Sequence, residues 1–195
     1  MDLVAMVRRR VTESIEAKQR MLQDETAMES LTVAVNAIHE AVIMGRKVFV
    51  CGNGGSAADA LHIAAEFTGR FRRDRRPYPA IALTGNTSAI TAIANDYSFE
   101  EVFSRQVEAF ATKGDILIAL STSGESRNVV FAARKAREVG AYVIALTGHK
   151  EGALTLEADV AIRVPATETS HIQECHMAVG HILAEVAELA MGDLA

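Results

Sequence analysis

The sequence has only two cysteines, Cys51 and Cys175, in 195 residues. Neither a disulfide framework nor a zinc site made of thiolates is indicated, so we expect both to be packing residues, Cys51 in a strand and Cys175 in a helix. No run approaches the ~20 apolar residues of a membrane-spanning helix, and the first residues lack the basic-then-apolar order of a signal peptide. We therefore expect a cytoplasmic protein with no membrane partner.

The chain also lacks repeats, low-complexity tracts and linkers, and only three prolines are present. This predicts a single domain over residues 1–195, with 49% apolar and 23% charged residues, as is ordinary for a globular protein. The net charge of -5 argues against nucleic acid as a partner, because the basic clusters Arg8–Arg10 and Arg70–Arg76 are local. Apart from Arg70, we expect the arginines of the second cluster to lie in a solvated loop.

Residues 1–44 contain neither glycine nor proline, and their apolar side chains recur at helical spacing. The pattern predicts two helices with a bend at Gln23–Thr26, and Gly45 follows the second helix where a terminating glycine is usual. Each helix has an apolar face to bury. In a chain of this size a partner subunit is a suitable surface, so we expect an oligomer in which the helical pair packs at the interface.

After Gly45, short apolar runs alternate with helical stretches, which predicts an α/β fold. The expected strands are Lys47–Cys51, Ala80–Leu83, Asp115–Leu120, Ala141–Leu146 and Asp159–Val164. The expected helices between them and after them are Ser56–Thr68, Phe99–Thr112, Ser126–Val139 and Ser170–Leu189. Because the strands are almost continuously apolar, helices should cover both faces of a doubly wound, five-stranded parallel sheet.

The segments that follow the predicted strands are rich in glycine and hydroxyl side chains: Gly52–Ser56, Thr84–Ser88, Ser121–Ser126 and Thr147–His149. Ligands of open parallel sheets bind beyond these strand ends. A glycine-rich turn at a helix start exposes backbone N–H groups to an anion, and Ser126 is a suitable N-cap for the helix after the third segment. The segments therefore indicate a site for a phosphorylated small molecule.

Two nucleotide-binding patterns and a purely structural interpretation compete with this one. Gly52, Gly54 and Ala57 fit a dinucleotide-binding pattern, but Thr84-Gly85 stands where a ribose-binding carboxylate is needed. The Gly-Lys-Ser/Thr ending of a triphosphate-binding loop is absent, so no nucleotide cofactor is expected. The remaining alternative is that glycine and serine only form tight turns here.

His62 and Glu66 are the best acid and base candidates, because a spacing of four places them one turn apart on the same helix face. There they can share a proton or a metal ion. A lone histidine is more often a packing or surface residue. The last helix adds His171, His176 and His181, whose spacing of five does not align them. Gln173 and His181 are separated by about 12 Å of rise and about 80° on a straight helix, so spacing does not predict their convergence.

Several motifs, in order, resemble those of the phosphoheptose isomerases in the sugar isomerase (SIS) domain family, from the N-terminal helices almost to the last residue. They are Cys51–Ser56, His62 with Glu66 and Thr68-Gly69-Arg70, Ala94-Asn95-Asp96, Ser121–Gly124 with Ser126, and Ile172-Gln173-Glu174 with His176 and His181. The resemblance implies a flavodoxin-like sheet, a homotetramer with sites near subunit interfaces, and conversion of sedoheptulose 7-phosphate to D-glycero-D-manno-heptose 7-phosphate. That product feeds bacterial heptose synthesis for surface glycans.

The resemblance also implies roles for individual residues. Glu66 and His181 would be catalytic. A divalent metal, usually zinc, would be bound by His62, Glu66, Gln173 and His181. The substrate contacts would be Asn53, Gly54, Gly55, Glu66, Asn95, Asp96, Ser121, Thr122, Ser123, Ser126 and Gln173.

The implied reaction suits these residue types, since moving a proton between adjacent carbons through an enediol needs a base, a donor to oxygen and stabilisation of negative charge. A carboxylate bound tightly to metal is a poorer base, so either the metal is loosely held or Glu66 leaves it during turnover. Two other hypotheses remain: an isomerase of another sugar phosphate, and a non-catalytic SIS protein that senses a sugar phosphate or binds a replication initiator.

Overall fold

A parallel β-sheet forms the centre of the structure, a computed structural model that describes residues 2–192. Within these residues the sheet has five strands in the order β2-β1-β3-β4-β5, and every neighbouring pair is parallel. The strands are β1 (Val48–Cys51), β2 (Ala80–Ala82), β3 (Ile116–Ser121), β4 (Tyr142–Gly148) and β5 (Val160–Val164). This order is that of flavodoxin-like sheets, and the predicted fold class is confirmed.

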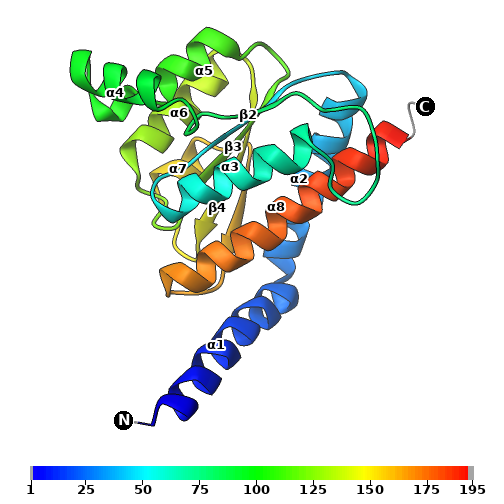
Figure 1. Cartoon of the computed structure of the whole chain (residues 1–195), viewed down its shortest axis with the longest axis vertical. Helices are drawn as coiled ribbons and strands as arrows, with labels where there is room; N and C mark the ends of the chain where they lie inside the picture. Colours follow the sequence, from blue (N-terminus) through cyan, green and yellow to red (C-terminus); the bar gives the residue numbers. More distant parts are fainter. Residues whose placement is uncertain (1, 193–195) are drawn as a thin grey trace.

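Helices cover both faces of the sheet (Figure 1). One face carries the C-terminal end of α1 together with α2, α3 and α8, and the other carries α5, α6 and α7. The bounds on the first face are α1 (Leu3–Gln23), α2 (Glu25–Ile43), α3 (Gly55–Thr68) and α8 (Thr169–Gly192). On the second face they are α5 (Ser104–Phe110), α6 (Arg127–Glu138) and α7 (Ala153–Leu156), with α4 (Thr87–Asp96) and the 3₁₀ helix η1 (Phe99–Glu101) at its edge.

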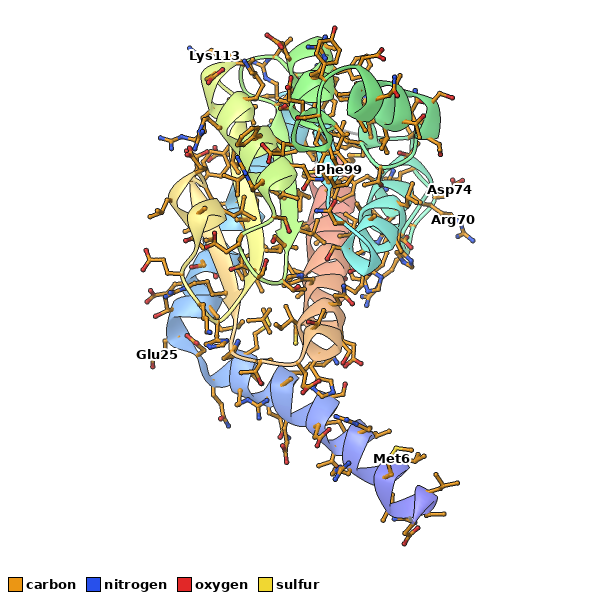
Figure 2. The ribbon with its side chains drawn as sticks, turned by 90° about the vertical axis from the view of Figure 1, so that its left-hand side faces the viewer. Met6, Glu25, Arg70, Asp74, Phe99 and Lys113 are labelled. Atoms are coloured by element: carbon orange, nitrogen blue, oxygen red, sulfur yellow. The ribbon has the colours of Figure 1, made fainter. Side chains whose placement is uncertain are left out.

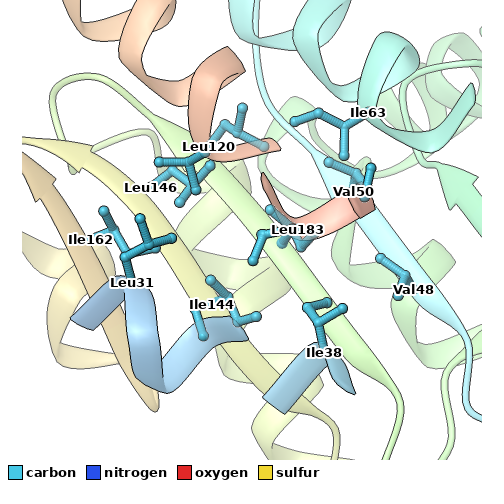
Figure 3. Close-up of a cluster of buried hydrophobic side chains, with 14 of the residues drawn as sticks. Leu31, Ile38, Val48, Val50, Ile63, Leu120, Ile144, Leu146, Ile162 and Leu183 are labelled. Carbon is cyan, nitrogen blue, oxygen red and sulfur yellow. The ribbon is translucent and has the colours of Figure 1, made fainter. Parts of the chain in front are cut away.

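Successive residues of each central strand pack into two different hydrophobic cores, one on either face of the sheet. In β1, Val48 and Val50 pack on the side of α2, α3 and α8, while Phe49 and Cys51 pack on the side of α5 and α6. Figure 3 shows the first core, where Val50, Ile63 and Leu183 meet between sheet and helices. Burial on both faces explains why the strands are almost wholly apolar. It also raises the pKa of Cys51 to about 12, so this cysteine is an inert packing residue, as expected.

The N-terminal helices form as predicted, with the break at Asp24. The Asp24 carboxylate accepts a hydrogen bond from the Ala27 N–H and caps α2, while its own N–H donates to the Met21 carbonyl of α1. Gly45 follows α2 with a φ of 65°, the left-handed conformation that glycine tolerates best.

The segment between β2 and β3 differs from the prediction of one helix over Phe99–Thr112. The structure has η1 and α5 there, and it adds α4, whose first residues lie in the segment expected to be a loop. The cause is local, because the Asn86 side chain accepts a hydrogen bond from the Ala89 N–H and starts a helix directly after the strand turn. The short helix α7 is likewise absent from the prediction.

The first half of α1 extends away from the sheet, as Met6 shows in Figure 2. Among its described residues only Ala17 and Met21 are buried, both near the C-terminal end. The apolar residues Leu3, Val4, Val7, Val11 and Ile15 are more than half exposed. Within residues 2–192, no helix combines the length and apolarity needed to cross a membrane.

Candidate active site

Helices α3 and α8 pack closely and run parallel, and this packing builds the candidate site. A Cβ on Gly180 of α8 would lie 2.5 Å from Ile63 Cγ1, and a Cβ on Gly55 of α3 would lie 2.5 Å from the Gln173 amide nitrogen. The two contacts are eight residues apart on α3 and seven apart on α8, about two turns on each helix. Two glycines thus allow the helices to approach in a fixed register, which brings residue 62 of α3 beside residue 181 of α8.

His62, Glu66 and His181 meet in this seam. His62 Nε2 lies 3.1 Å from Glu66 Oε1 and 3.2 Å from His181 Nε2. One potential ligand atom from each of the three side chains lies within 4.8 Å of the other two. The His62 side chain is 52% exposed and that of Glu66 24% exposed, so the group is open to a ligand from outside. The structure therefore brings together both predicted catalytic residues and one further predicted metal ligand.

These three side chains also fit a divalent metal chemically. Imidazole nitrogens and a carboxylate oxygen are common zinc ligands, and two nitrogens each about 2.0 Å from a tetrahedral ion stand about 3.3 Å apart. The distance between the two Nε2 atoms, 3.2 Å, is close to that value. Without an ion, the same distance needs a hydrogen bond in which one ring is the donor and the other the acceptor.

Asp59 is a fourth titratable residue of this region, and it was not predicted from the sequence. It precedes His62 by three residues on α3, and this helical spacing was the signal that could have identified it. Burial raises the pKa of Asp59, and nearby His62 opposes that effect. The Asp59 Oδ2 atom is buried and has no hydrogen-bond partner among residues 2–192.

The segment after β3 forms a compact hydroxyl cluster. Ser121 Oγ donates to Ser126 Oγ at 3.0 Å and lies 3.4 Å from Ser123 Oγ, which accepts from the Glu125 N–H. Gly124 has a φ of 72°, which makes the tight turn possible. Ser126 is the N-cap residue of α6, as predicted, but its hydroxyl bonds to Ser121 instead of the helix. The start of α6 thus has no side-chain cap bond from Ser126, and its N–H groups lie next to three hydroxyls, an arrangement suited to an anion.

A cavity of ≈ 530 Å³ opens beside this cluster. Thr122 and Ser123 line it from the segment after β3, and His149 and Lys150 line it from the segment after β4. The Lys150 ammonium was not among the predicted site residues, although it follows directly on the predicted segment Thr147–His149. The combination of hydroxyls and a cation favours an anionic group here.

The turn after β1 is fixed by close packing and by an amide pair. A Cβ on Gly52 would lie 2.7 Å from the Ser56 carbonyl oxygen, so only glycine fits, and Gly54 has a φ of 56° at the start of α3. Asn53 and Asn128 exchange two hydrogen bonds of 2.8 Å, which join this turn to the first turn of α6. Asn128, a buried residue, was not predicted from the sequence.

Three predicted site residues lie outside the His62–Glu66–His181 group and outside the hydroxyl cluster after β3. Gln173 packs against Gly55, about 10 Å along the α3 axis from His62 by the rise of seven residues, so its place in a metal site stays a prediction. Asn95 and Asp96 are exposed on α4, where Asn95 Nδ2 donates to Asp96 Oδ1 at 2.8 Å. Their contact with substrate also stays a prediction.

His176 lies in the interior beneath the site. Its Nε2 is 3.2 Å from the Thr147 carbonyl oxygen at the end of β4, and its Nδ1 has no hydrogen-bond partner among residues 2–192. Burial lowers the pKa of His176 to about 4, although the bond to Thr147 opposes that effect. At neutral pH it is therefore an uncharged donor that ties α8 to the sheet.

Comparisons with known proteins agree with this architecture. The family model described as SIS domain matches residues 12–148. A phosphoheptose isomerase of Clostridium acetobutylicum is 47% identical over 178 residues, 91% of either chain. A phosphoheptose isomerase of Aquifex aeolicus is 46% identical over 95% of this chain and 96% of its own.

Two solved structures share the fold across almost their whole length. The phosphoheptose isomerase of Neisseria gonorrhoeae superposes with a TM-score of 0.89 at 40% identity, covering 96% of this chain and 99% of that one. The phosphoheptose isomerase of Francisella tularensis gives a TM-score of 0.91 at 35% identity, covering 97% and 100%.

Proposed function

Since the chain belongs to the phosphoheptose isomerases of the SIS domain family, we propose that it converts sedoheptulose 7-phosphate to D-glycero-D-manno-heptose 7-phosphate. The observation that carries the proposal is the meeting of His62, Glu66 and His181 in the seam between α3 and α8. In this arrangement one small ligand can reach both a carboxylate and an imidazole, which supports the roles of base and acid. The product would supply bacterial heptose synthesis, and a cytoplasmic location is part of the same proposal.

Glu66 acts as the base in the proposed reaction. It removes a proton from C1 of the open-chain ketose, the C1–H electron pair becomes the C1–C2 double bond of an enediol, and the proton returns to C2. His181 donates a proton to the C2 oxygen as the enediol forms and accepts one from the C1 oxygen as the aldehyde appears. Both proton transfers are balanced within this pair, which general acid–base catalysis requires.

The hydroxyl cluster and the glycine turn would bind the phosphate. Ser121, Thr122, Ser123 and Ser126 offer hydroxyls at the start of α6, and Asn53, Gly54 and Gly55 offer an amide and backbone N–H groups at the start of α3. Hydrogen bonds to the phosphate dianion are charge-assisted and hold the sugar in one orientation. Gln173, Asn95 and Asp96 would contact the sugar hydroxyls.

A divalent metal would be bound by His62, Glu66 and His181, with Gln173 as the further ligand that the family pattern implies. When bound, such an ion polarises a substrate carbonyl as a Lewis acid. Metal analysis combined with an isomerase assay before and after chelation tests this assignment. Loss of turnover that zinc restores supports it, and full turnover by metal-free protein contradicts it.

We further propose a homotetramer with the N-terminal helical pair at the interface. The support is the row of exposed apolar residues on α1, which a monomer would leave in water. Light scattering should show a tetramer for the wild-type protein. A Val7→Lys, Val11→Lys variant should dissociate, whereas an Arg9→Lys variant, which keeps the charge at an exposed position, should not.

The function is tested by following the aldose formed from sedoheptulose 7-phosphate, with a pentose phosphate and an amino-sugar phosphate as competing substrates. Preference for the heptose supports the proposal, and preference for another sugar phosphate identifies the alternative isomerase. The non-catalytic hypothesis is not favoured, because the curated relatives at 46–47% identity are named as isomerases. Absence of any turnover by folded, zinc-loaded protein would revive it.

A further inference from the structure

The carboxylate of Glu188 is buried beside the site but takes no part in the proposed chemistry. Its oxygens accept hydrogen bonds from the backbone N–H groups of Phe71, Arg72 and Arg73, at 3.0 to 3.2 Å. Burial would raise the pKa of Glu188, but these three donors and the charge of Arg75 outweigh it and lower the pKa below its usual value. Glu188 is therefore an ionised anchor for the segment that follows α3.

Arg75 connects this anchor to the helix that carries Glu66. Its Nε lies 3.6 Å from Glu188 Oε1, and the two side chains are only 7% and 3% exposed. The same guanidinium donates to the carbonyl oxygen of Glu66 at 2.8 Å and to that of Phe67 at 2.9 Å, in the last turn of α3. Arg75 thus lies in a buried bridge, in contrast to the solvated loop expected from the sequence.

Phe71 connects the anchor to His181. The Phe71 ring stacks on the His181 imidazole with centroids 5.6 Å apart and an interplanar angle of 28°. The Phe71 N–H is one of the three held by Glu188, which follows His181 by seven residues on α8. The Glu188 carboxylate therefore holds both Arg75, which binds the Glu66 carbonyl, and Phe71, whose ring packs on His181.

We propose that Glu188 is a positioning residue, which through Arg75 and Phe71 sets the placement of Glu66 relative to His181. The proposal rests on the proposed function for its kinetic consequences. A bridge of this kind acts only by geometry: a displacement of about 1 Å between reacting groups can cost about 100-fold in rate. Side chains that orient metal ligands likewise change metal affinity, by about 10- to 100-fold when they are replaced.

The chain offers a matched control for this proposal. Glu185 lies on the same helix and binds the same segment through Arg72, at 2.7 Å, but the two side chains are 36% and 66% exposed. Solvent-exposed pairs contribute little, so Glu185→Gln should leave kcat, KM and zinc affinity within about twofold of the wild type.

Glu188→Gln keeps the shape of the side chain and removes its charge. We expect kcat to fall by about 10- to 100-fold with KM changed less than about threefold, and zinc affinity, measured by competition with a chromophoric chelator, to fall by about tenfold. A merely structural Glu188 would lower the melting temperature while the folded protein kept wild-type kcat and zinc affinity, and that result would overturn the proposal.

If Glu188→Gln does not fold, Arg75→Lys takes its place, because it keeps the positive charge but not the fork that reaches the α3 carbonyls. A lower kcat and weaker zinc binding in this variant support the proposal, and wild-type values refute it. The proposed function and the positioning role of Glu188 fail by different results. An inactive wild-type protein would refute the proposed function, whereas equal zinc affinities in the Glu188 and Glu185 variants would refute the positioning role.

Discussion

The two ends of α3 show two ways of building one site. At its N-terminal end lies the glycine turn, which Asn53 joins to the hydroxyl cluster at the start of α6, and within that cluster neighbours in the sequence are in contact, such as Ser121 with Ser126. At its C-terminal half, His62 meets His181 across 119 residues of sequence, and only the packing of α3 on α8 brings them together. The shape of each proposed binding segment is thus a local feature, although Asn53 and Asn128 join the two segments across 75 residues, whereas the proposed acid–base group exists only through tertiary structure. The first should determine KM and the second kcat.

His181→Asn provides the strongest test of this division. Asparagine can still form a hydrogen bond but cannot exchange a proton near neutral pH, so we expect kcat to fall by about 100- to 10,000-fold. KM for the sugar phosphate should stay within about threefold. A large rise in KM with kcat unchanged would show that His181 serves binding and would contradict this division.

Gly180→Ala tests whether the register of the two helices is essential. The new methyl group would overlap Ile63, which is fully buried, and we expect the free energy of unfolding to fall by about 1–3 kcal/mol and kcat to fall with it. Thermal unfolding and steady-state kinetics measure both effects. In an Ile63→Ala background the methyl group has room, so the cost of Gly180→Ala should shrink. An equal cost in both backgrounds would show that the helices do not depend on this contact.

Ser123→Ala tests the binding end. Loss of one hydrogen bond from the protein to a charged ligand costs about 1.5–3 kcal/mol of binding free energy. KM should therefore rise by about 10- to 100-fold while kcat changes little. Thr155 provides a control, because its hydroxyl donates to the Gly152 carbonyl oxygen at the start of α7 and belongs to neither binding segment. Thr155→Val also removes a hydroxyl and should leave KM unchanged. If Ser123→Ala lowers kcat alone, the hydroxyl cluster belongs to the chemistry and not to binding.

Protonation of His176 should make the free energy of unfolding depend on pH. Replacing His176 should affect kcat and KM less than replacing His181, Gly180 or Ser123. Its pKa is about 4 in the folded protein and 6.5 when unperturbed, so between these values the unfolded chain binds the extra proton. The free energy of unfolding should therefore fall as the pH drops from 6.5 to 4, by up to about 3 kcal/mol. Denaturant unfolding of the wild type and of His176→Gln measures this, and equal pH slopes in the two proteins would contradict it.

The features that could be predicted from the sequence are those that depend on neighbouring residues, namely the sheet and the polar segments after its strands. The alternation of apolar runs and helices predicts the sheet, and Gly52–Ser56 and Ser121–Ser126 stand out because glycine and hydroxyls follow buried strands. The helix α4 was missed because its start depends on the single cap Asn86 within a polar segment.

The other end of the site could be only partly predicted. His62 and Glu66 form a local pair, but the partnership with His181 came from a family resemblance, since no spacing rule joins α3 to α8. Glu188 and Arg75 were not predicted as a pair for the same reason, because a carboxylate and a guanidinium 113 residues apart have no local signature.

In the proposed mechanism Glu66 moves the proton, and the rest of the site holds the sugar phosphate in place for it. Steady-state kinetics of Glu66→Gln with sedoheptulose 7-phosphate tests it most directly, because the amide has nearly the same shape and cannot act as a base. We predict a kcat at least about 1,000-fold below the wild type, with the melting temperature preserved and KM within about threefold. A kcat within about tenfold of the wild type would contradict the claim.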